Sequence, residues 1–156
     1  SGEEILAALN EVFEAIHKAG GIAGIHICAN TDWGLILEST VDVVNFDAFG
    51  YADRFLLYAD QVGPFLARGG LIAWGLIPTG PADVIDAESV DTLVARWREL
   101  LAAAAAAGLD TEVLRRQSLI TPSCGTGSLS VAHARKVLDL TREVSRVVRG
   151  GGKRPK

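Results

Sequence analysis

Apolar runs and amphipathic stretches alternate along this chain. Residues 4–18 place apolar side chains at spacings of three and four and are followed by Gly20 and Gly21, a pattern that predicts an amphipathic helix. Four short apolar runs follow, separated by loops with Gly, Pro and polar residues, and each run predicts a strand. The predicted strands cover residues 22–28, 41–46, 71–77 and 118–121.

Helical patterns fill the segments between and after these strands. The predicted helices run from a cap at Thr31 or Asp32 through residue 37, over residues 51–67 and 87–107, and from a cap at Ser128 or Ser130 to residue 149. Nearly continuous apolar strands are typical of a parallel sheet covered on both faces, with helices as the crossovers. The fold class is therefore α/β. We expect one domain over residues 1–149 and a flexible C-terminal tail over residues 150–156.

Two architectures suit four βα units preceded by one helix. One is a small doubly wound sheet. The other is half of a TIM-type βα barrel, because four units in about 150 residues are half of a barrel that typically has roughly 250 residues. Composition leaves both open.

Composition narrows the classes of partner. The 156 residues are 49% hydrophobic and carry 15 basic and 19 acidic side chains, a formal net charge of −4. Nucleic acid or an anionic membrane would call for clustered Lys and Arg, so neither partner is expected. No uncharged apolar run approaches the roughly 20 residues of a membrane-spanning helix, and residues 1–4 lack the pattern of a signal peptide. The protein is therefore expected to be cytoplasmic, and in such a reducing compartment thiols like those of Cys28 and Cys124 are more often free, metal-bound or catalytic than disulfide-bonded.

Reactive side chains collect where the predicted strands end. His26 and Cys28 close the first strand, Asp47 follows the second, and Cys124 follows the fourth. The carboxyl ends of parallel strands are where α/β proteins bind ligands. His26 and Cys28 are two positions apart, so their side chains leave the same face of the strand, although a His and a Cys in an apolar strand are also common core residues.

The position of Cys124 favours a metal site. It lies in the turn-forming segment PSCGTG, where a buried structural thiol is less expected. Three nitrogen and sulfur ligands with one open position are typical of a catalytic zinc site, whereas structural sites use four protein ligands. We therefore predict Zn²⁺ bound by His26, Cys28 and Cys124. Asp47 is either a fourth ligand or a helix cap, and the sequence leaves both open.

This ligand set favours one reaction class. Two thiolates, an imidazole and a carboxylate would give a zinc site with net negative charge, at which an incoming thiol can displace a weak oxygen ligand and become a nucleophile. Alkylation of a thiol is therefore favoured over hydrolysis. Neither a GxGxxG fingerprint nor a P-loop lysine is present, so no nucleotide is predicted. Several further side chains could contact the substrate, although a turn, a helix cap or core packing explains a number of them equally well. These candidates are Asn30, Asp32, Trp33, Trp74, Thr79 and Ser123.

Four segments together resemble a known superfamily. They are HICAN at residues 26–30, VVNFD at 43–47, AWGLIPT at 73–79 and TPSCG at 121–125. They are similar to the C-terminal half of the cobalamin-independent methionine synthases and uroporphyrinogen decarboxylases, a group that includes zinc methyltransferases acting on corrinoid-bound methyl groups. The resemblance implies an eight-stranded βα barrel of which this chain supplies the last four strands.

The resemblance also implies roles for particular residues. His26, Cys28 and Cys124 match the zinc ligands, and Asp47 matches the place where the methionine synthases have a glutamate ligand. The segment around Asp47 departs from that pattern and also resembles the corrinoid-linked relatives, where an Asp follows a Ser-Phe pair. A thiol such as homocysteine is the implied substrate, as in methionine synthesis, and a methylated folate or a methylcorrinoid protein is the implied methyl donor.

The first half of such a barrel is absent from this chain. Four strands alone leave two sheet edges exposed, and exposed edges are normally paired or covered. We therefore expect a separate N-terminal half barrel, a homo-oligomer that closes the barrel, or a chain that is a fragment.

Two alternatives to a methyltransferase stay open. One is a non-catalytic metal-binding half barrel that assembles with itself or a partner. The other, a porphyrin-type decarboxylase, suits the fold but does not need the two cysteines.

Overall fold

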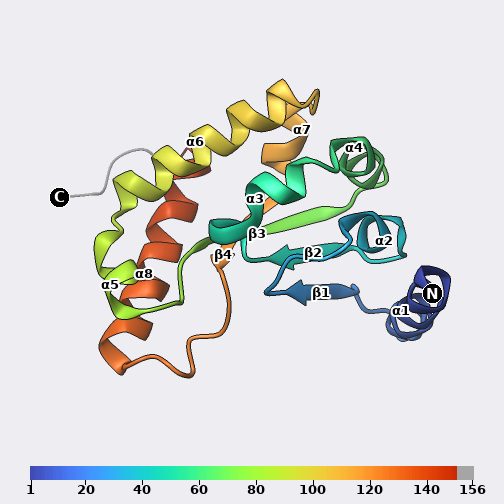
Figure 1. The fold of residues 1–156 in the computed structure, drawn as a ribbon, viewed down its shortest axis with the longest axis horizontal. Coiled ribbons are helices and arrows are strands. Elements are labelled where there is room, and N and C mark those ends of the chain that lie inside the picture. Colours follow the sequence, from blue (N-terminus) through green and yellow to red (C-terminus); the bar gives the residue numbers. More distant parts are fainter. Residues whose placement is uncertain (151–156) are drawn as a thin grey trace.

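The computed structural model describes residues 1–150, so the expected tail, apart from Gly150, lies outside the described residues. This part of the chain has eight helices and four strands. Figure 1 shows their arrangement in space. Their bounds are α1 Gly2–Lys18, β1 Gly24–Ile27, α2 Trp33–Glu38, β2 Val43–Phe46, α3 Ala48–Leu56, α4 Ala59–Ala67, β3 Leu71–Ile77, α5 Ala82–Ala87, α6 Val90–Ala106, α7 Thr111–Arg116, β4 Ser118–Pro122 and α8 Val131–Val148. None of these helices is long and apolar enough to cross a membrane.

The four strands form a sheet in which every neighbouring pair is parallel. Their order in space is the order of the chain, β1-β2-β3-β4. This confirms the predicted α/β class with parallel strands. The order differs from that of a doubly wound sheet, which reverses at one point.

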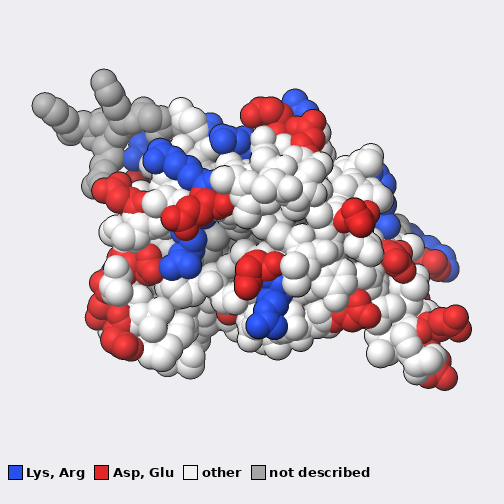
Figure 2. All heavy atoms as spheres, turned by 45° about the horizontal axis from the view of Figure 1, so that its top comes forward, with Lys and Arg blue, Asp and Glu red and all other residues white. Residues whose placement is uncertain are grey.

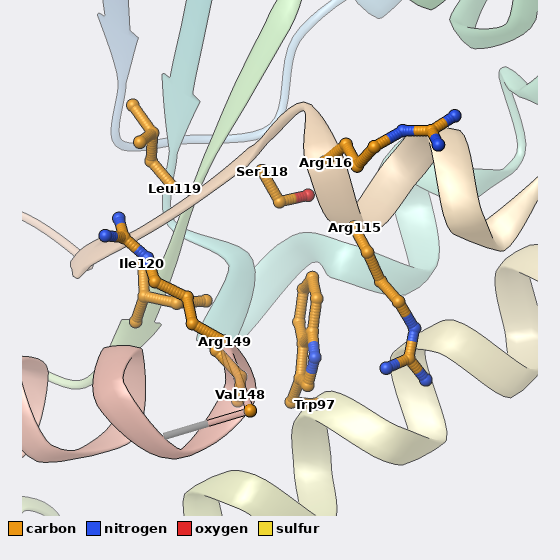
Figure 3. Close-up of a pocket in the computed structure, with 9 residues that line it drawn as sticks. Trp97, Arg115, Arg116, Ser118, Leu119, Ile120, Val148 and Arg149 are labelled. Atoms are coloured by element: carbon orange, nitrogen blue, oxygen red, sulfur yellow. The ribbon is translucent and has the colours of Figure 1, made fainter.

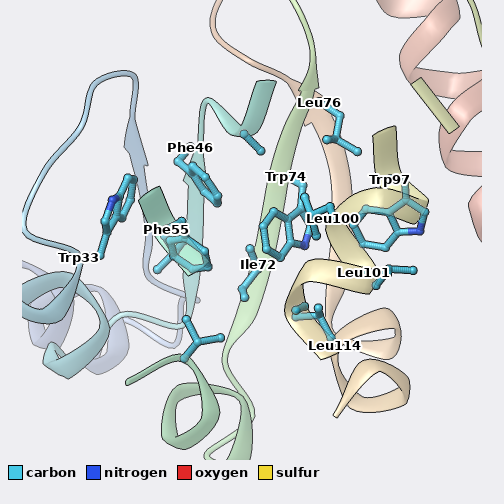
Figure 4. Close-up of a cluster of buried hydrophobic side chains, with 14 of the residues drawn as sticks. Trp33, Phe46, Phe55, Ile72, Trp74, Leu76, Trp97, Leu100, Leu101 and Leu114 are labelled. Atoms are coloured by element: carbon cyan, nitrogen blue, oxygen red, sulfur yellow. The ribbon is translucent and has the colours of Figure 1, made fainter. Parts of the chain in front are cut away.

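One face of the sheet is covered by helices and forms the core. α3 and α6 pack on β3, α8 packs on β4, and Figure 1 shows α3, α4 and α6 on one side of the strands. Phe46 of β2 and Trp74 of β3 point into this layer and are fully buried. They join Trp33, Phe55 and Trp97 in an aromatic cluster whose neighbouring ring centroids lie 4.5–6.0 Å apart (Figure 4). Large aromatic side chains of this kind dominate the energetics of a core.

The opposite face of the sheet is covered less completely. His26, Asn45, Ala73 and Leu119 lie in register across it, one from each strand. Ala73 on the inner strand β3 is buried and Asn45 is half-buried, whereas His26 is exposed and Leu119 is 37% exposed. The apolar runs predicted a sheet covered on both faces. The structure differs at β1 and β4 because they are the edges of the sheet, with no further strand beside them in residues 1–150.

The long helices lie where the periodicity predicts them, with differences at their ends. α1, α6 and α8 begin at side-chain caps from Ser1, Ser89 and Ser130. The helix predicted over residues 51–67 is two helices, α3 and α4, separated at Leu57 and Tyr58. The six-residue helix α2 is predicted from its cap, but the sequence pattern does not predict α5 and α7, because six residues are too few to show a helical period.

Candidate metal centre

Three predicted ligands come together at the carboxyl end of the sheet. His26 lies on β1, Cys28 follows that strand directly, and Cys124 lies in the loop after β4. One ligand atom from each, the two Sγ atoms and a ring nitrogen, lies within 4.8 Å of the other two. All three side chains are exposed. A group of this kind could hold a metal ion.

The spacing of these atoms is close to that of a bound metal. Tetrahedral zinc, with bonds of about 2.1 Å to nitrogen and 2.3 Å to sulfur, places its ligand atoms roughly 3.5–3.8 Å apart. Side-chain rotations that move these exposed ligand atoms by up to about 1 Å therefore suffice to close the group around an ion. Cysteine sulfur and histidine nitrogen are ligands that favour zinc among the abundant divalent ions.

The curvature of the sheet brings the three ligands together. In a flat sheet β1 and β4 would lie about 14 Å apart, three times the usual strand spacing. Asn45 of β2 nevertheless donates a hydrogen bond from Nδ2 to Oγ1 of Thr121 on β4, at 2.8 Å, across β3. β3 offers only Ala73 and Gly75 on this face at that level, and these small residues leave room for the contact.

Asn45 also fixes the orientation of His26. Nδ2 of Asn45 donates to the backbone carbonyl of Ala73 at 2.9 Å, and a carbonyl can only accept, so Oδ1 must face the other way. Oδ1 lies 2.6 Å from Nδ1 of His26 and accepts its hydrogen. In a neutral imidazole the other ring nitrogen then carries the lone pair. Nε2 of His26 is therefore the atom prepared for a metal, in the arrangement that histidine ligands commonly use.

The loop that carries Cys124 is anchored by its neighbour Ser123. The N–H of Ser123 donates to the carbonyl of Ile77 at 2.8 Å, and its buried Oγ accepts from the N–H of Thr79 at 3.1 Å. Gly75 leaves no space beneath this loop, since a Cβ there would lie 2.4 Å from the oxygen of Phe46 and 2.7 Å from Cα of Ser123. Thr79 and Ser123, predicted as substrate contacts, thus bond to each other and hold the loop in place.

The predicted fourth ligand, Asp47, has another partner. Its side chain caps α3 and accepts a hydrogen bond from the N–H of Gly50 at 2.9 Å. Among the described His, Cys, Asp and Glu side chains, the group within 4.8 Å consists of His26, Cys28 and Cys124 alone. The structure therefore places Asp47 in the capping role that the sequence left open.

The remaining predicted substrate contacts are also engaged locally. Asp32 caps α2 by accepting from the N–H of Gly34, and Asn30 accepts from the indole N–H of Trp33 at 3.3 Å. Trp33 and Trp74 are fully buried in the aromatic cluster, on the covered face of the sheet. As placed, neither tryptophan exposes surface that a substrate can contact.

Sequence reasoning missed Asn45 and Thr121. A usable signal exists for Asn45, because it interrupts the β-branched strand VVNF at a position that lies opposite His26 in the parallel register. A polar amide at such a position needs partners. Thr121 carries no comparable signal, because its contact depends on the curvature of the sheet.

Comparison of the chain with protein-family models, with curated proteins and with solved structures found no match.

Proposed function

We propose that this chain is a zinc-dependent methyltransferase-type domain that activates a thiol, with His26, Cys28 and Cys124 holding the ion. The observation that carries the proposal is the meeting of one imidazole and two thiol side chains from opposite edges of the sheet. The same three residues match the zinc ligands of the resembled superfamily.

The ligand number supports a catalytic site. Three protein ligands leave one position of tetrahedral zinc open, and the exposure of all three side chains makes that position accessible from solvent. Zinc bound there would lower the pKa of a thiol that takes the open position, so that the thiol reacts as a thiolate near neutral pH. His26 is held for this role by Asn45, and Cys124 by the anchored loop.

The proposed reaction is a methyl transfer to sulfur. The thiol loses its proton to solvent, its sulfur forms a bond to the methyl carbon, and the bond from that carbon to the donor breaks with the electron pair leaving on the donor. A homocysteine-like thiol is the proposed acceptor. A methylfolate or a methylcorrinoid protein is the proposed donor, in line with the resemblance.

We further propose that the chain is half of a βα barrel. Parallel strands in sequential order, with helices on one face and a partly exposed opposite face, suit this architecture. The open face and both sheet edges would then be covered by a second copy or by an N-terminal half barrel. The complete catalytic site would need that second half.

A second candidate function is a non-catalytic metal-binding half barrel. It is favoured by the locations of the described substrate candidates, because Trp33 and Trp74 are buried and Asp32, Thr79 and Ser123 are engaged in structural hydrogen bonds. In this case the same three ligands would join the two edges of the sheet without presenting an exchangeable position.

Zinc binding by the purified full chain tests the proposal. We expect about one zinc ion per chain in the wild type, and loss of most of it in Cys124→Ser and His26→Asn, because each removes one of three ligands. His133→Asn is the matched control: His133 bonds to Ser130 and Asp86 away from the centre, so this variant should keep its zinc.

Two outcomes separate the candidates. X-ray absorption of the zinc-loaded protein should show the number of sulfur ligands rising from two to three when homocysteine is added; an unchanged sulfur count would favour the non-catalytic candidate. A wild-type chain that takes up no zinc, with both cysteines freely alkylated in its presence, would refute both.

A further inference from the structure

A cavity lies at the end of β4 opposite to the proposed metal ligands. It has a volume of about 550 Å³ and is enclosed by α6, α7, the start of β4 and the end of α8 (Figure 3). Ser118, the first residue of β4, lines it, whereas Cys124 follows the last residue of that strand. Pockets for small ligands typically measure roughly 300–1,000 Å³, so this hollow is large enough for one.

The charged side chains that line this cavity are all basic. Three arginines line it, Arg115 and Arg116 from α7 and Arg149 from the end of α8, together with the indole of Trp97. No Asp or Glu is among its lining residues. An adjoining cavity of about 190 Å³ shares Trp97 and Arg115, adds Arg98, and is likewise without a lining carboxylate.

This concentration of positive charge is unusual for the chain, whose formal net charge is −4. Figure 2 shows acidic and basic side chains interspersed over one face of the molecule. The guanidinium ends of Arg115, Arg116 and Arg149 point in different directions around the hollow (Figure 3). Each guanidinium offers several N–H donors and no acceptor, so an anion in the cavity would attract them.

One residue that lines the cavity, Trp97, has a buried and unpartnered donor. Trp97 is 4% exposed, and its Nε1–H has no hydrogen-bond partner among the described residues. Buried donors are nearly always paired with protein, water or ligand, so an unpaired one calls for an acceptor. The hydroxyl of Ser118 does not supply it: it donates to the carbonyl of Leu114 at 2.6 Å and accepts from the indole of Trp74 at 2.8 Å.

The arginines are also available. In the described part of the chain, neither Arg116 nor Arg149 has a carboxylate oxygen within 4.0 Å, and the nearest carboxylate to Arg115 is that of Glu112 at 3.9 Å, with both side chains largely exposed. Exposed pairs at that distance are weak and exchange readily with other anions. No close ion pair among the described residues therefore holds Arg115 or Arg149 back from a ligand.

We propose that this cavity binds a small organic anion, whose phosphate or carboxylate group is held by Arg115, Arg149 and the indole N–H of Trp97. Guanidinium forks match both kinds of oxyanion with paired hydrogen bonds. The apolar part of the ligand would lie against Leu119, Ile120 and Val148, which form the rest of the wall. This site is independent of the proposed metal centre.

Titration of the full chain with three probes tests the proposal: inorganic phosphate, phenyl phosphate and benzoate, at constant ionic strength. The chain has three tryptophans, so the ¹⁵N–¹H spectrum has three indole signals, and Trp97→Phe identifies the one that belongs to Trp97. We expect that signal to shift saturably with phenyl phosphate or benzoate, because its N–H gains an acceptor, while the signal of the buried Trp33, which lines neither cavity, stays in place.

The probes distinguish the ligand chemistries. Tighter binding of phenyl phosphate assigns a phosphate ligand, and tighter binding of benzoate assigns a carboxylate. Phenyl phosphate should bind more tightly than inorganic phosphate, because only the former covers the apolar wall. Equal affinities for phenyl phosphate and inorganic phosphate would show that the apolar wall does not contribute to binding, contrary to the proposal.

Variants locate the binding. Arg115→Gln combined with Arg149→Gln should weaken the better probe at least about tenfold, since two charge-assisted interactions are lost. Arg54→Gln, an exposed arginine of α3 outside both cavities, is the matched control and should bind as the wild type does.

A chain shortened to end at Gly150 removes Lys153, Arg154 and Lys156. It should retain binding, whereas loss of binding would assign the anion to these basic residues and overturn the proposal. A Trp97 signal that none of the three probes moves would overturn it as well.

Discussion

At the scale of single residues, Asn45 connects most of the proposed metal centre. Its amide hydrogens reach the carbonyl of Ala73 and the hydroxyl of Thr121, and its oxygen accepts from His26. A half-buried amide with all these partners has one orientation available, and that orientation determines the tautomer of His26. The neighbour of a ligand thus decides which ligand atom faces the metal.

Replacing Asn45 with Ala should therefore weaken zinc binding without removing a ligand. Loss of a hydrogen-bonding partner behind a metal-bound histidine typically lowers metal affinity roughly 10–100-fold, and we expect a loss in that range. Competition with a chromophoric zinc chelator measures it. Asn10→Ala is the control, because Asn10 accepts from Thr40 away from the centre. Equal affinities of Asn45→Ala and the wild type would show that Asn45 does not orient His26.

The residue scale also shows what strand patterns can predict. The rule that parallel strands present their carboxyl ends at one edge predicts that His26, Cys28 and Cys124 share that edge, whereas their approach to within 4.8 Å depends on the curvature of the sheet. Side chains with two common roles were harder to place. Asp47 and Trp74 lie near that edge in sequence. In the structure, Asp47 caps α3 and Trp74 lies in the core. Sequence position alone does not say on which side of a pleated strand the core lies.

At the scale of elements, a carboxylate joins α1 to the sheet. Asp42, just before β2, accepts from Nε2 of His17 on α1 at 2.8 Å and from the N–H of Ala23, just before β1, at 2.7 Å. Burial works to raise the pKa of Asp42, but the hydrogen bonds from His17 and Ala23, with the nearby charge of Arg68, outweigh it and hold that pKa below its ordinary value. The folded state thus prefers the ionised carboxylate.

This preference predicts how the stability depends on pH. A folded-state pKa below the unfolded value, which is about 3.9 for Asp, means that the stabilisation is present above that pH and is lost as the pH falls through the folded pKa. Asp42→Asn should therefore lower the free energy of unfolding at pH 5 and have less effect at pH 3. Urea denaturation of both proteins at the two pH values measures the difference.

Asp53→Asn is the control for this experiment, because the carboxylate of Asp53 lies 4.0 Å from Arg54 with both side chains well exposed. Such pairs contribute little to stability. An effect of Asp42→Asn that is as large at pH 3 as at pH 5 would contradict the role assigned to the ionised carboxylate.

Helices with a clear period were predictable, whereas of the three six-residue helices only α2 was predicted, from its cap at Thr31 or Asp32. α1, α6 and α8 each have 17 or 18 residues, so several turns repeat the same apolar spacing. α7 has six residues and depends on Asp110, which accepts from the N–H groups of Glu112 and Val113. A capping aspartate of this kind can be recognised in a sequence only where the residues after it already indicate a helix.

At the scale of the whole molecule, the distribution of burial is uneven. The covered face of the sheet carries the aromatic cluster, whereas on the opposite face the edge strands leave His26 and Leu119 exposed. Parallel sheets are usually buried on both faces, and sheet edges are usually protected. The exposed face and the edges of β1 and β4 therefore form a surface suited to cover by further protein.

We predict that the chain alone forms a dimer in which β4 of each copy pairs with β1 of the other. A twofold axis through the barrel makes both new pairs parallel, which continues the pattern within the chain. Sedimentation equilibrium should then give twice the chain mass of 16.5 kDa. Leu119→Lys should return the protein to the monomer mass, because a lysine at a strand edge opposes pairing. Leu138→Lys, on the exposed side of α8, should leave the dimer intact. A wild-type chain that stays monomeric as its concentration rises would exclude a second copy as the cover and leave a separate half barrel as the predicted partner.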